Sequence, residues 1–173
     1  MKDKISCCIE CGSHNIEYVT KPEIVKVVDD EIMVDASYWL CYDCKSEFKN
    51  MFDGNSYLLN AYNIYRKKHN MLMPEEIKAI REQYGLTQEE LASLLGWDKK
   101  SIARYERGSL QDSSHDRMLK LLKEPVAFLR LINDINMKLL NNMNIVKSAS
   151  KCRELIKTKY SHNDCYKDIL ETV

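Results

Sequence analysis

The strongest constraint on this chain is a pair of Cys-x-x-Cys motifs close to its N-terminus. The motifs consist of Cys8 with Cys11 and of Cys41 with Cys44, and residues 12–40 lie between them. Two thiols at this spacing suit a tight turn that aims both sulfurs at one ion, and Zn²⁺ prefers a tetrahedron of four such sulfurs. The spacing therefore predicts a structural zinc site with these four cysteines as ligands.

The segment between the motifs alternates between apolar and polar residues. Residues 24–28 and 32–38 both alternate, and Asp29-Asp30-Glu31 separates them, so we expect a β-hairpin or a short meander. A sheet this small needs a cross-link to be stable, and a bound zinc ion would supply it. A redox motif is disfavoured because no βαβ pattern surrounds the cysteines, and a disulfide framework is typical of secreted chains. Four protein ligands leave no open position for water, so we expect no enzymatic activity.

Composition and charge narrow the class of protein further. The 173 residues are 45% hydrophobic and 30% charged, as in a globular protein of one large or two small domains. No apolar run approaches the roughly 18 residues that a membrane-spanning helix needs. The N-terminus leads into cysteines instead of the apolar core of a signal peptide. We therefore expect a cytoplasmic protein with no membrane contact, whose cysteines are reduced or bound to metal.

Charge is distributed unevenly although the net charge is zero. Residues 1–60 hold 6 Lys and Arg against 11 Asp and Glu, whereas residues 61–173 hold 20 against 15. This asymmetry indicates that only the second part of the chain meets phosphate. Between the two parts, residues 57–68 have the apolar spacing of a connecting helix. Its basic end, 66–68, suits either phosphate contact or a solvated helix terminus.

A series of helix signals begins at Pro74. Pro74 and two following glutamates start a first helix that Gly85 ends, and Thr87 with Glu90 forms a capping box for a second. We expect Asp98 to cap a third helix, which runs from Lys99 to about Arg107. Further helices are expected over 113–123 and from Pro125 onward.

Two short helices joined by a glycine turn, the second of them basic, are typical of a helix-turn-helix. Lys100 and Arg104 are four residues apart and therefore share one face of the third helix. Arginine can bind guanine O6 and N7 with two hydrogen bonds, which favours base contact by Arg104. For Lys100, the sequence favours base contact and a solvated position equally.

At this point the sequence resembles a known family. The motifs are Gly85-Leu86-Thr87-Gln88-x-x-Leu91-Ala92, Leu95-Gly96-Trp97 and Ile102-x-Arg104-Tyr105-Glu106-Arg107-Gly108. They resemble the XRE/Cro-type helix-turn-helix, and the cysteine motifs resemble the YgiT-type zinc finger. In this order they resemble the MqsA-type antitoxins of bacterial toxin–antitoxin modules, over about residues 7–135.

The resemblance implies a role for each part of the chain. The zinc domain would stabilise the fold and contact a toxin, and the helix-turn-helix domain would dimerise and repress the module's own promoter. An ion pair between Arg81 and Glu106 is also implied, as is a contact of Gln88 near the DNA backbone. Lys100 stands where the family has asparagine, so the operator sequence does not carry over. The full set expected to contact DNA is Gln88, Lys99, Lys100, Ser101, Arg104 and Arg107.

We expect a homodimer on double-stranded DNA with a near-palindromic operator, because one recognition helix reads too few base pairs to specify a promoter. The apolar stripe Phe128, Ile132, Ile135 and Leu139 is the candidate dimer surface. The competing interpretation is that this stripe belongs to the core of a single chain.

Together these features predict an α+β fold. A zinc-bound β domain (1–56) is followed by a connecting helix (57–72), a helix-turn-helix domain of about five helices (73–140) and a C-terminal helical extension (141–173). The functional hypothesis is a DNA-binding antitoxin of a type II toxin–antitoxin module, which neutralises a toxin and represses its own promoter. The alternative is a stand-alone zinc-containing regulator, of phage or mobile-element type or a thiol or metal sensor in which Cys7 and the zinc thiolates form the switch.

Overall fold

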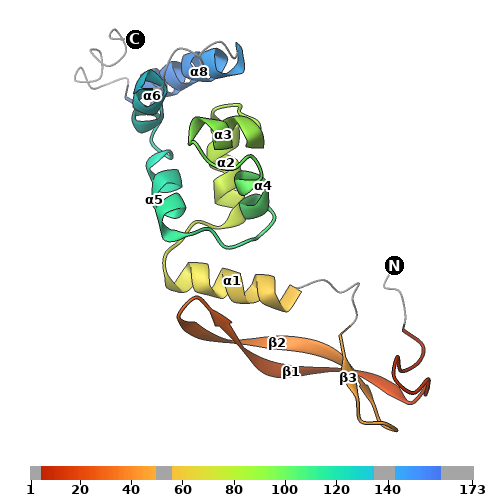
Figure 1. Ribbon diagram of the computed structural model, residues 1–173. Coiled ribbons are helices and arrows are strands. Elements are labelled where there is room, and N and C mark those ends of the chain that lie inside the picture. Colours follow the sequence, from red (N-terminus) through yellow and green to blue (C-terminus); the bar gives the residue numbers. More distant parts are fainter. Residues whose placement is uncertain (1–4, 50–55, 135–142, 161–173) are drawn as a thin grey trace. The chain divides into compact units, whose positions relative to one another are not determined.

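The computed structural model describes residues 5–49, 56–134 and 143–160 (Figure 1). The fold is α+β, as expected from the sequence, with an antiparallel sheet followed by helices. The chain divides into two compact units, Met1–His69 and Asn70–Val173. Within the described ranges, no helix is both long enough and apolar enough to cross a membrane.

The sheet of the first unit is a long hairpin with a short third strand. Strands β1 (Ile16–Val27) and β2 (Asp30–Cys41) pair antiparallel from end to end. The predicted hairpin is therefore present, with strands longer than the alternating stretches suggested. Strand β3 (Glu47–Phe48) pairs with Trp39 and Leu40, so the return of the chain after the second cysteine motif extends the sheet.

Helix α1 (Ser56–Lys68) packs on the hairpin. Alternate residues of β2 are buried on one face, which is the period-2 pattern of a half-buried strand; they are Ile32, Val34, Ala36 and Tyr38. From the helix, Ala61 and Arg66 are fully buried, and Arg66 donates to Asn63 Oδ1 at 2.9 Å. The helix expected as a connection is thus part of the first unit, and Arg66 is not available to phosphate.

The second unit is built from six helices within the described residues. Their bounds are α2 (Pro74–Gln83), α3 (Gln88–Leu94), α4 (Ser101–Glu106), α5 (Ser113–Leu121), α6 (Pro125–Asp134) and α8 (Met143–Lys159). The capping box predicted for α3 is present. Thr87 Oγ1 accepts from the Glu90 amide, and the Glu90 carboxylate accepts from the Thr87 amide.

Helix α4 starts later than expected. It begins at Ser101 instead of Lys99, because Lys99 and Lys100 form a turn in which Asp98 Oδ1 accepts from the Lys100 amide at 3.0 Å. Asp98 therefore caps a turn that precedes the helix. The short α4 still directs Ile102 and Tyr105 into the core, as predicted.

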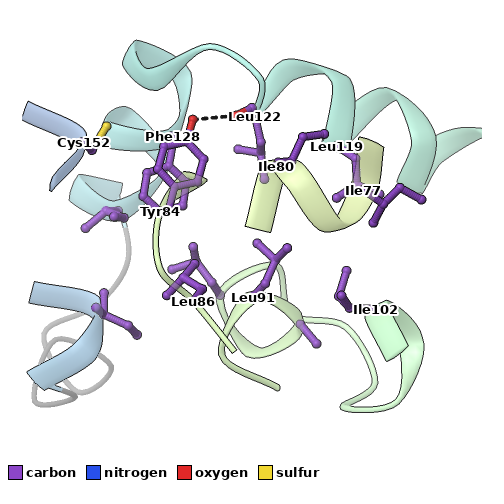
Figure 2. Packing of buried hydrophobic residues seen from close by; sticks show 14 of the residues in the cluster. Ile77, Ile80, Tyr84, Leu86, Leu91, Ile102, Leu119, Leu122, Phe128 and Cys152 are labelled. Atoms are coloured by element: carbon purple, nitrogen blue, oxygen red, sulfur yellow. Dashed lines mark hydrogen bonds between the residues drawn. The ribbon is translucent and has the colours of Figure 1, made fainter. Parts of the chain in front are cut away.

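One apolar core holds these helices together (Figure 2). Tyr84 at the end of α2 stacks on Phe128 of α6 with ring centroids 3.6 Å apart, and its hydroxyl donates to Leu122 O at 2.6 Å. The buried hydroxyl is thus satisfied, which avoids the penalty of an unpaired polar group.

The position of Phe128 corrects the expectation for a dimer surface. Phe128 is fully buried and Ile132 is 3% exposed, both within the core of this one chain. The competing interpretation given above is the one that the structure shows for these two residues. Ile135 and Leu139 lie outside the described residues.

Helix α8 completes the same core. Ile145, Cys152 and Ile156 on its apolar face are almost completely buried. Burial raises the pKa of the Cys152 thiol to about 11, and the thiol donates to Pro125 O at 3.0 Å. Cys152 therefore contributes to the packing of the core as a buried, neutral thiol.

A buried carboxylate fixes the start of the second unit. Asp116 in α5 is 3% exposed, and its Oδ1 accepts from the Leu72 amide at 2.8 Å and from Gln111 Nε2 at 3.1 Å. Lys120 lies 2.7 Å from the other oxygen and also donates to Asn70 O. The chain is therefore tied to α5 immediately before α2 begins.

Candidate metal centre and nucleic-acid interface

The two cysteine motifs fold into turns of the same form. Cys8 N donates to Ser13 O at 2.7 Å, and Cys41 N donates to Ser46 O at 3.0 Å. The residue after the second cysteine of each motif has a left-handed backbone, with φ of 72° at Gly12 and 61° at Lys45. Each turn therefore presents its two sulfurs in the same way.

The four sulfurs lie close enough to share one ion. All four Sγ atoms are within 4.8 Å of one another, and the separations are 3.6 Å for Cys8 and Cys44 and 3.6 Å for Cys11 and Cys41. Zn–S bonds of about 2.3 Å in a tetrahedron require sulfurs about 3.8 Å apart. The cluster predicted from the sequence can therefore hold a metal ion and fits zinc. Four thiolates would fill its coordination, so zinc would act here as a structural cross-link.

Ser46 supports this cluster and was not identified from the sequence. Its hydroxyl lies 3.3 Å from Cys8 Sγ and 2.9 Å from Cys44 Sγ. This hydrogen bonding lowers the pKa of Cys8 to about 6 and also lowers that of Cys44. The thiolate is the form that binds metal, so Ser46 favours binding. Its place two residues after Cys44 could have indicated this role.

A polar bridge joins the two cysteine turns. Asp43 accepts from Ser13 Oγ at 2.5 Å and from Asn15 Nδ2 at 2.9 Å, and Tyr42 N donates to Asn15 O at 2.9 Å. These hydrogen bonds connect the two turns outside the sulfur cluster. Cys7, which is half-buried, is not a member of the four-sulfur cluster.

The basic face of α4 is exposed. Lys99, Lys100, Arg104 and Arg107 all point outward in the described structure, and Arg107 Nε donates to Ala103 O at 3.0 Å. Ser101 differs from the expectation, because it is only 3% exposed and lies against the core. The Ser101 side chain is therefore not part of the exposed basic face.

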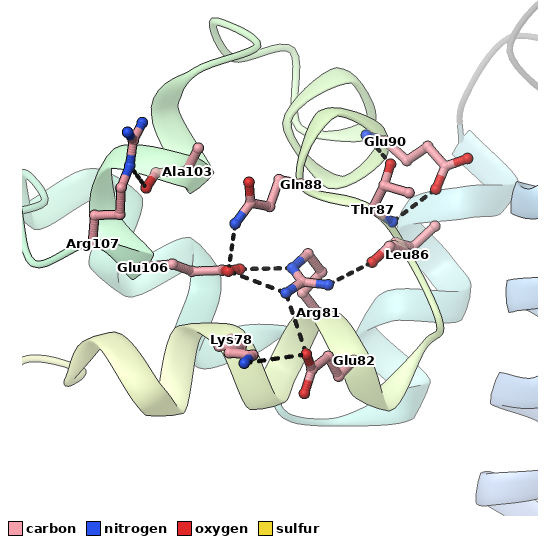
Figure 3. Close-up of polar contacts among 10 residues, drawn as sticks. All are labelled: Lys78, Arg81, Glu82, Leu86, Thr87, Gln88, Glu90, Ala103, Glu106 and Arg107. Atoms are coloured by element: carbon pink, nitrogen blue, oxygen red, sulfur yellow. Dashed lines mark hydrogen bonds and ion pairs between the residues drawn. The ribbon is translucent and has the colours of Figure 1, made fainter.

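Glu106 ties α4 to both preceding helices (Figure 3). Arg81 Nε donates to its Oε1 at 2.6 Å and Arg81 Nη2 to its Oε2 at 3.1 Å, so the pair is bidentate and mostly buried. Gln88 Nε2 donates to the same Oε2 at 2.7 Å. The structure thus brings together the ion pair that the resemblance implies, and adds Gln88 to it.

Comparison with known proteins agrees with this geometry. Residues 77–124, which include α3, α4 and α5, match the Helix-turn-helix family of the XRE type. These residues form a helix-turn-helix domain. The match indicates a DNA-binding regulator, and no curated protein matches the chain.

Within this helix-turn-helix domain, α3 and α4 are the two helices of the motif and Gly96 is in the turn between them. Gly96 has φ of 69°, a left-handed conformation that glycine adopts without strain. The exposed basic side chains of α4 and its flanking turns are those of Lys99, Lys100, Arg104 and Arg107.

Proposed function

We propose that this chain is a zinc-stabilised, DNA-binding antitoxin that acts as a homodimer, represses its own promoter and has no enzymatic activity. The observation that supports it most directly is the exposed basic face of α4, held at a fixed angle to α3 by the Arg81–Glu106–Gln88 network. A rigid recognition helix is what base reading in the major groove requires.

Arg104 and Gln88 have different roles in this proposal. Arg104 is exposed on α4 and reads a base, whereas Gln88 positions the domain on a phosphate. One hydrogen of the Gln88 amide is already donated to Glu106, and the other is available for a phosphate oxygen. Gln88 therefore reaches the DNA while still attached to the network that orients α4.

Dimer formation needs a surface other than the buried stripe of α6. In the second unit, Leu121 is 60% exposed and Met118 is 38% exposed, and the two lie three residues apart on the outer face of α5. We propose this face as part of the dimer contact. Half-site centres would then lie about 34 Å apart, or a multiple of that, along a near-palindromic operator.

The antitoxin role is supported by the order of a four-cysteine unit and a helix-turn-helix domain in one chain. Within the described residues 5–49 and 56–69 of the first unit, the one helix, α1, packs on the hairpin, and the face of the hairpin opposite to its buried β2 residues carries exposed apolar side chains. On this face Ile24 and Met33 are cross-strand partners, 61% and 66% exposed. Apolar side chains exposed on a sheet are suited to contact with another protein, here the toxin.

Selection of duplexes from a random pool by the purified chain tests the DNA-reading part. Arg104→Ala should lower affinity for the selected duplex by about 1–3 kcal/mol and relax the preference at one base pair. Lys67→Ala, an exposed residue of α1, serves as the charge-matched control and should lower affinity evenly, if at all. An equal loss for Arg104→Ala on selected and random duplexes would show that it holds phosphate only.

Purification of the tagged chain from its native host tests the antitoxin part. The expected result is one stoichiometric partner whose growth inhibition the chain relieves, with binding lost in Met33→Glu and retained in Leu121→Glu. Recovery without a partner would favour a stand-alone regulator. Release of DNA by peroxide, abolished by Cys7→Ser, would favour the thiol sensor.

A further inference from the structure

Helix α8 lies beside the end of α3 that carries Gln88. Asn144 Nδ2, in its first turn, donates to Glu90 Oε1 at 2.7 Å. The other oxygen of Glu90 accepts from the Thr87 amide at 2.8 Å, which completes the capping box of α3. One carboxylate therefore joins the start of α8 to the start of α3.

A second contact fixes the same side of α8 two turns later. Lys151 Nζ donates to Glu82 O near the end of α2, at 3.3 Å. Lys147 is three residues after Asn144 and four before Lys151, so all three lie on one side of the helix. Lys147 itself is exposed. Lys147 therefore lies on α8 between two residues that are bound to the α2–α3 region.

The charges of the two helices are complementary. The first turn of α3 carries Glu89 and Glu90 next to Gln88, and these carboxylates oppose the approach of a phosphate. The described part of α8 carries five basic residues and one acidic residue. Because α8 contacts α3 through Asn144, the positive charge of α8 partly offsets these carboxylates.

We propose that α8 is a third DNA-contacting element, in which Lys147 binds a backbone phosphate next to the one held by Gln88. This inference rests on the proposed DNA-binding function and extends it to a helix outside the matched helix-turn-helix region. Lys147 contributes to affinity and not to sequence preference, since a phosphate carries no base information. The apolar side of α8 packs on the core, and its basic side meets the DNA.

The salt dependence of DNA binding by the full chain tests the proposal. With a duplex of random sequence as the probe, Lys147→Gln should weaken binding and reduce the slope of log affinity against log salt by about 0.9, the value for one phosphate contact. Lys147→Arg keeps the charge and should keep the slope. Lys147 is exposed, so thermal unfolding should be unchanged in both variants.

Lys157→Gln is the matched control. Lys157 is an exposed lysine of the same helix, ten residues and therefore about 15 Å further along its axis. The Lys157→Gln variant should keep both the DNA affinity and the salt-dependence slope of the unmodified chain. Equal slopes for Lys147→Gln and Lys157→Gln would overturn the inference, while binding by the unmodified chain would keep the proposed function intact. If the unmodified chain binds no duplex, both fail.

Discussion

Gln88 and Glu106 are joined by a hydrogen bond of 2.7 Å, and the carboxylate that accepts it also binds Arg81. Three helices thus meet at one side chain of α4. Because Glu106 lies two residues after Arg104, the same contact that holds the helices together sets the direction of the proposed base-reading arginine.

Replacement of Glu106 by glutamine should destabilise the second unit strongly. Arg81 is 12% exposed and would keep its charge without the carboxylate that compensates it, at a cost of about 3–5 kcal/mol. Glu82→Gln is the control, because Glu82 also contacts Arg81 but is 55% exposed. Urea unfolding measures both. An equal effect of the two substitutions would contradict a buried, energetically coupled pair.

The Arg81–Glu106 pair should also make the unfolding free energy depend on pH in the acidic range. Burial alone would raise the pKa of Glu106, but hydrogen bonds from Arg81 and Gln88 outweigh it and hold the pKa below the ordinary value of 4.5. The stabilisation is therefore complete above pH 4.5 and is lost as the pH falls through the lower, folded-state pKa. The difference in unfolding free energy between the native chain and Glu106→Gln should shrink below pH 4.5. A constant difference down to pH 3 would refute this assignment.

Removal of zinc should affect the two units differently. In the first unit, Cys8 and Cys41 pack with Phe48 in a small cluster at the proposed metal site, whereas the second unit has a large core that shares no residue with this cluster. Chelation, or Cys44→Ser, should abolish hydrogen-exchange protection in β1 and β2 and leave protection in α2–α6 unchanged. Cys7→Ser is the control and should retain one zinc per chain. Zinc loss in this control would mean that Cys7 is a ligand.

The tip of the hairpin should tolerate a stabilising substitution. Val28 has φ of 55°, a left-handed conformation that is strained for a β-branched residue, and its side chain is 58% exposed. Val28→Asn should therefore raise stability by about 1 kcal/mol, since asparagine adopts this conformation more readily. Met33→Asn, at an exposed position within β2, should give no gain. Thermal unfolding of the zinc-loaded chain compares the two.

The sequence predicted best those features that depend on a few neighbouring residues. The capping box at Thr87 and the inward position of Ile102 follow from local spacing, and the four-sulfur cluster follows from two local Cys-x-x-Cys motifs whose shared ligand chemistry predicts that they meet; the structure contains all three. The α+β order followed from a change of periodicity between the two parts of the chain.

What the sequence did not predict depends on residues far apart in the chain. The apolar stripe that contains Phe128 left both a dimer surface and a single-chain core open, and the stacking of Phe128 on Tyr84 places it in the core. Ser101 was expected to contact DNA, yet its side chain is buried. Arg66 was expected either to contact phosphate or to lie at a solvated helix end, yet it is buried. Packing partners of this kind leave no periodic signal in one sequence.

The buried contact between Asp116 and the Leu72 amide has a consequence for how such chains are assembled by recombination. Both partners belong to the second unit, as do Gln111 and Lys120, which complete the network. A gene fusion that joined a different N-terminal unit at residue 70 would carry the whole network with it. The helical unit can therefore be inherited as a self-contained module, with its entry point already fixed by its own side chains.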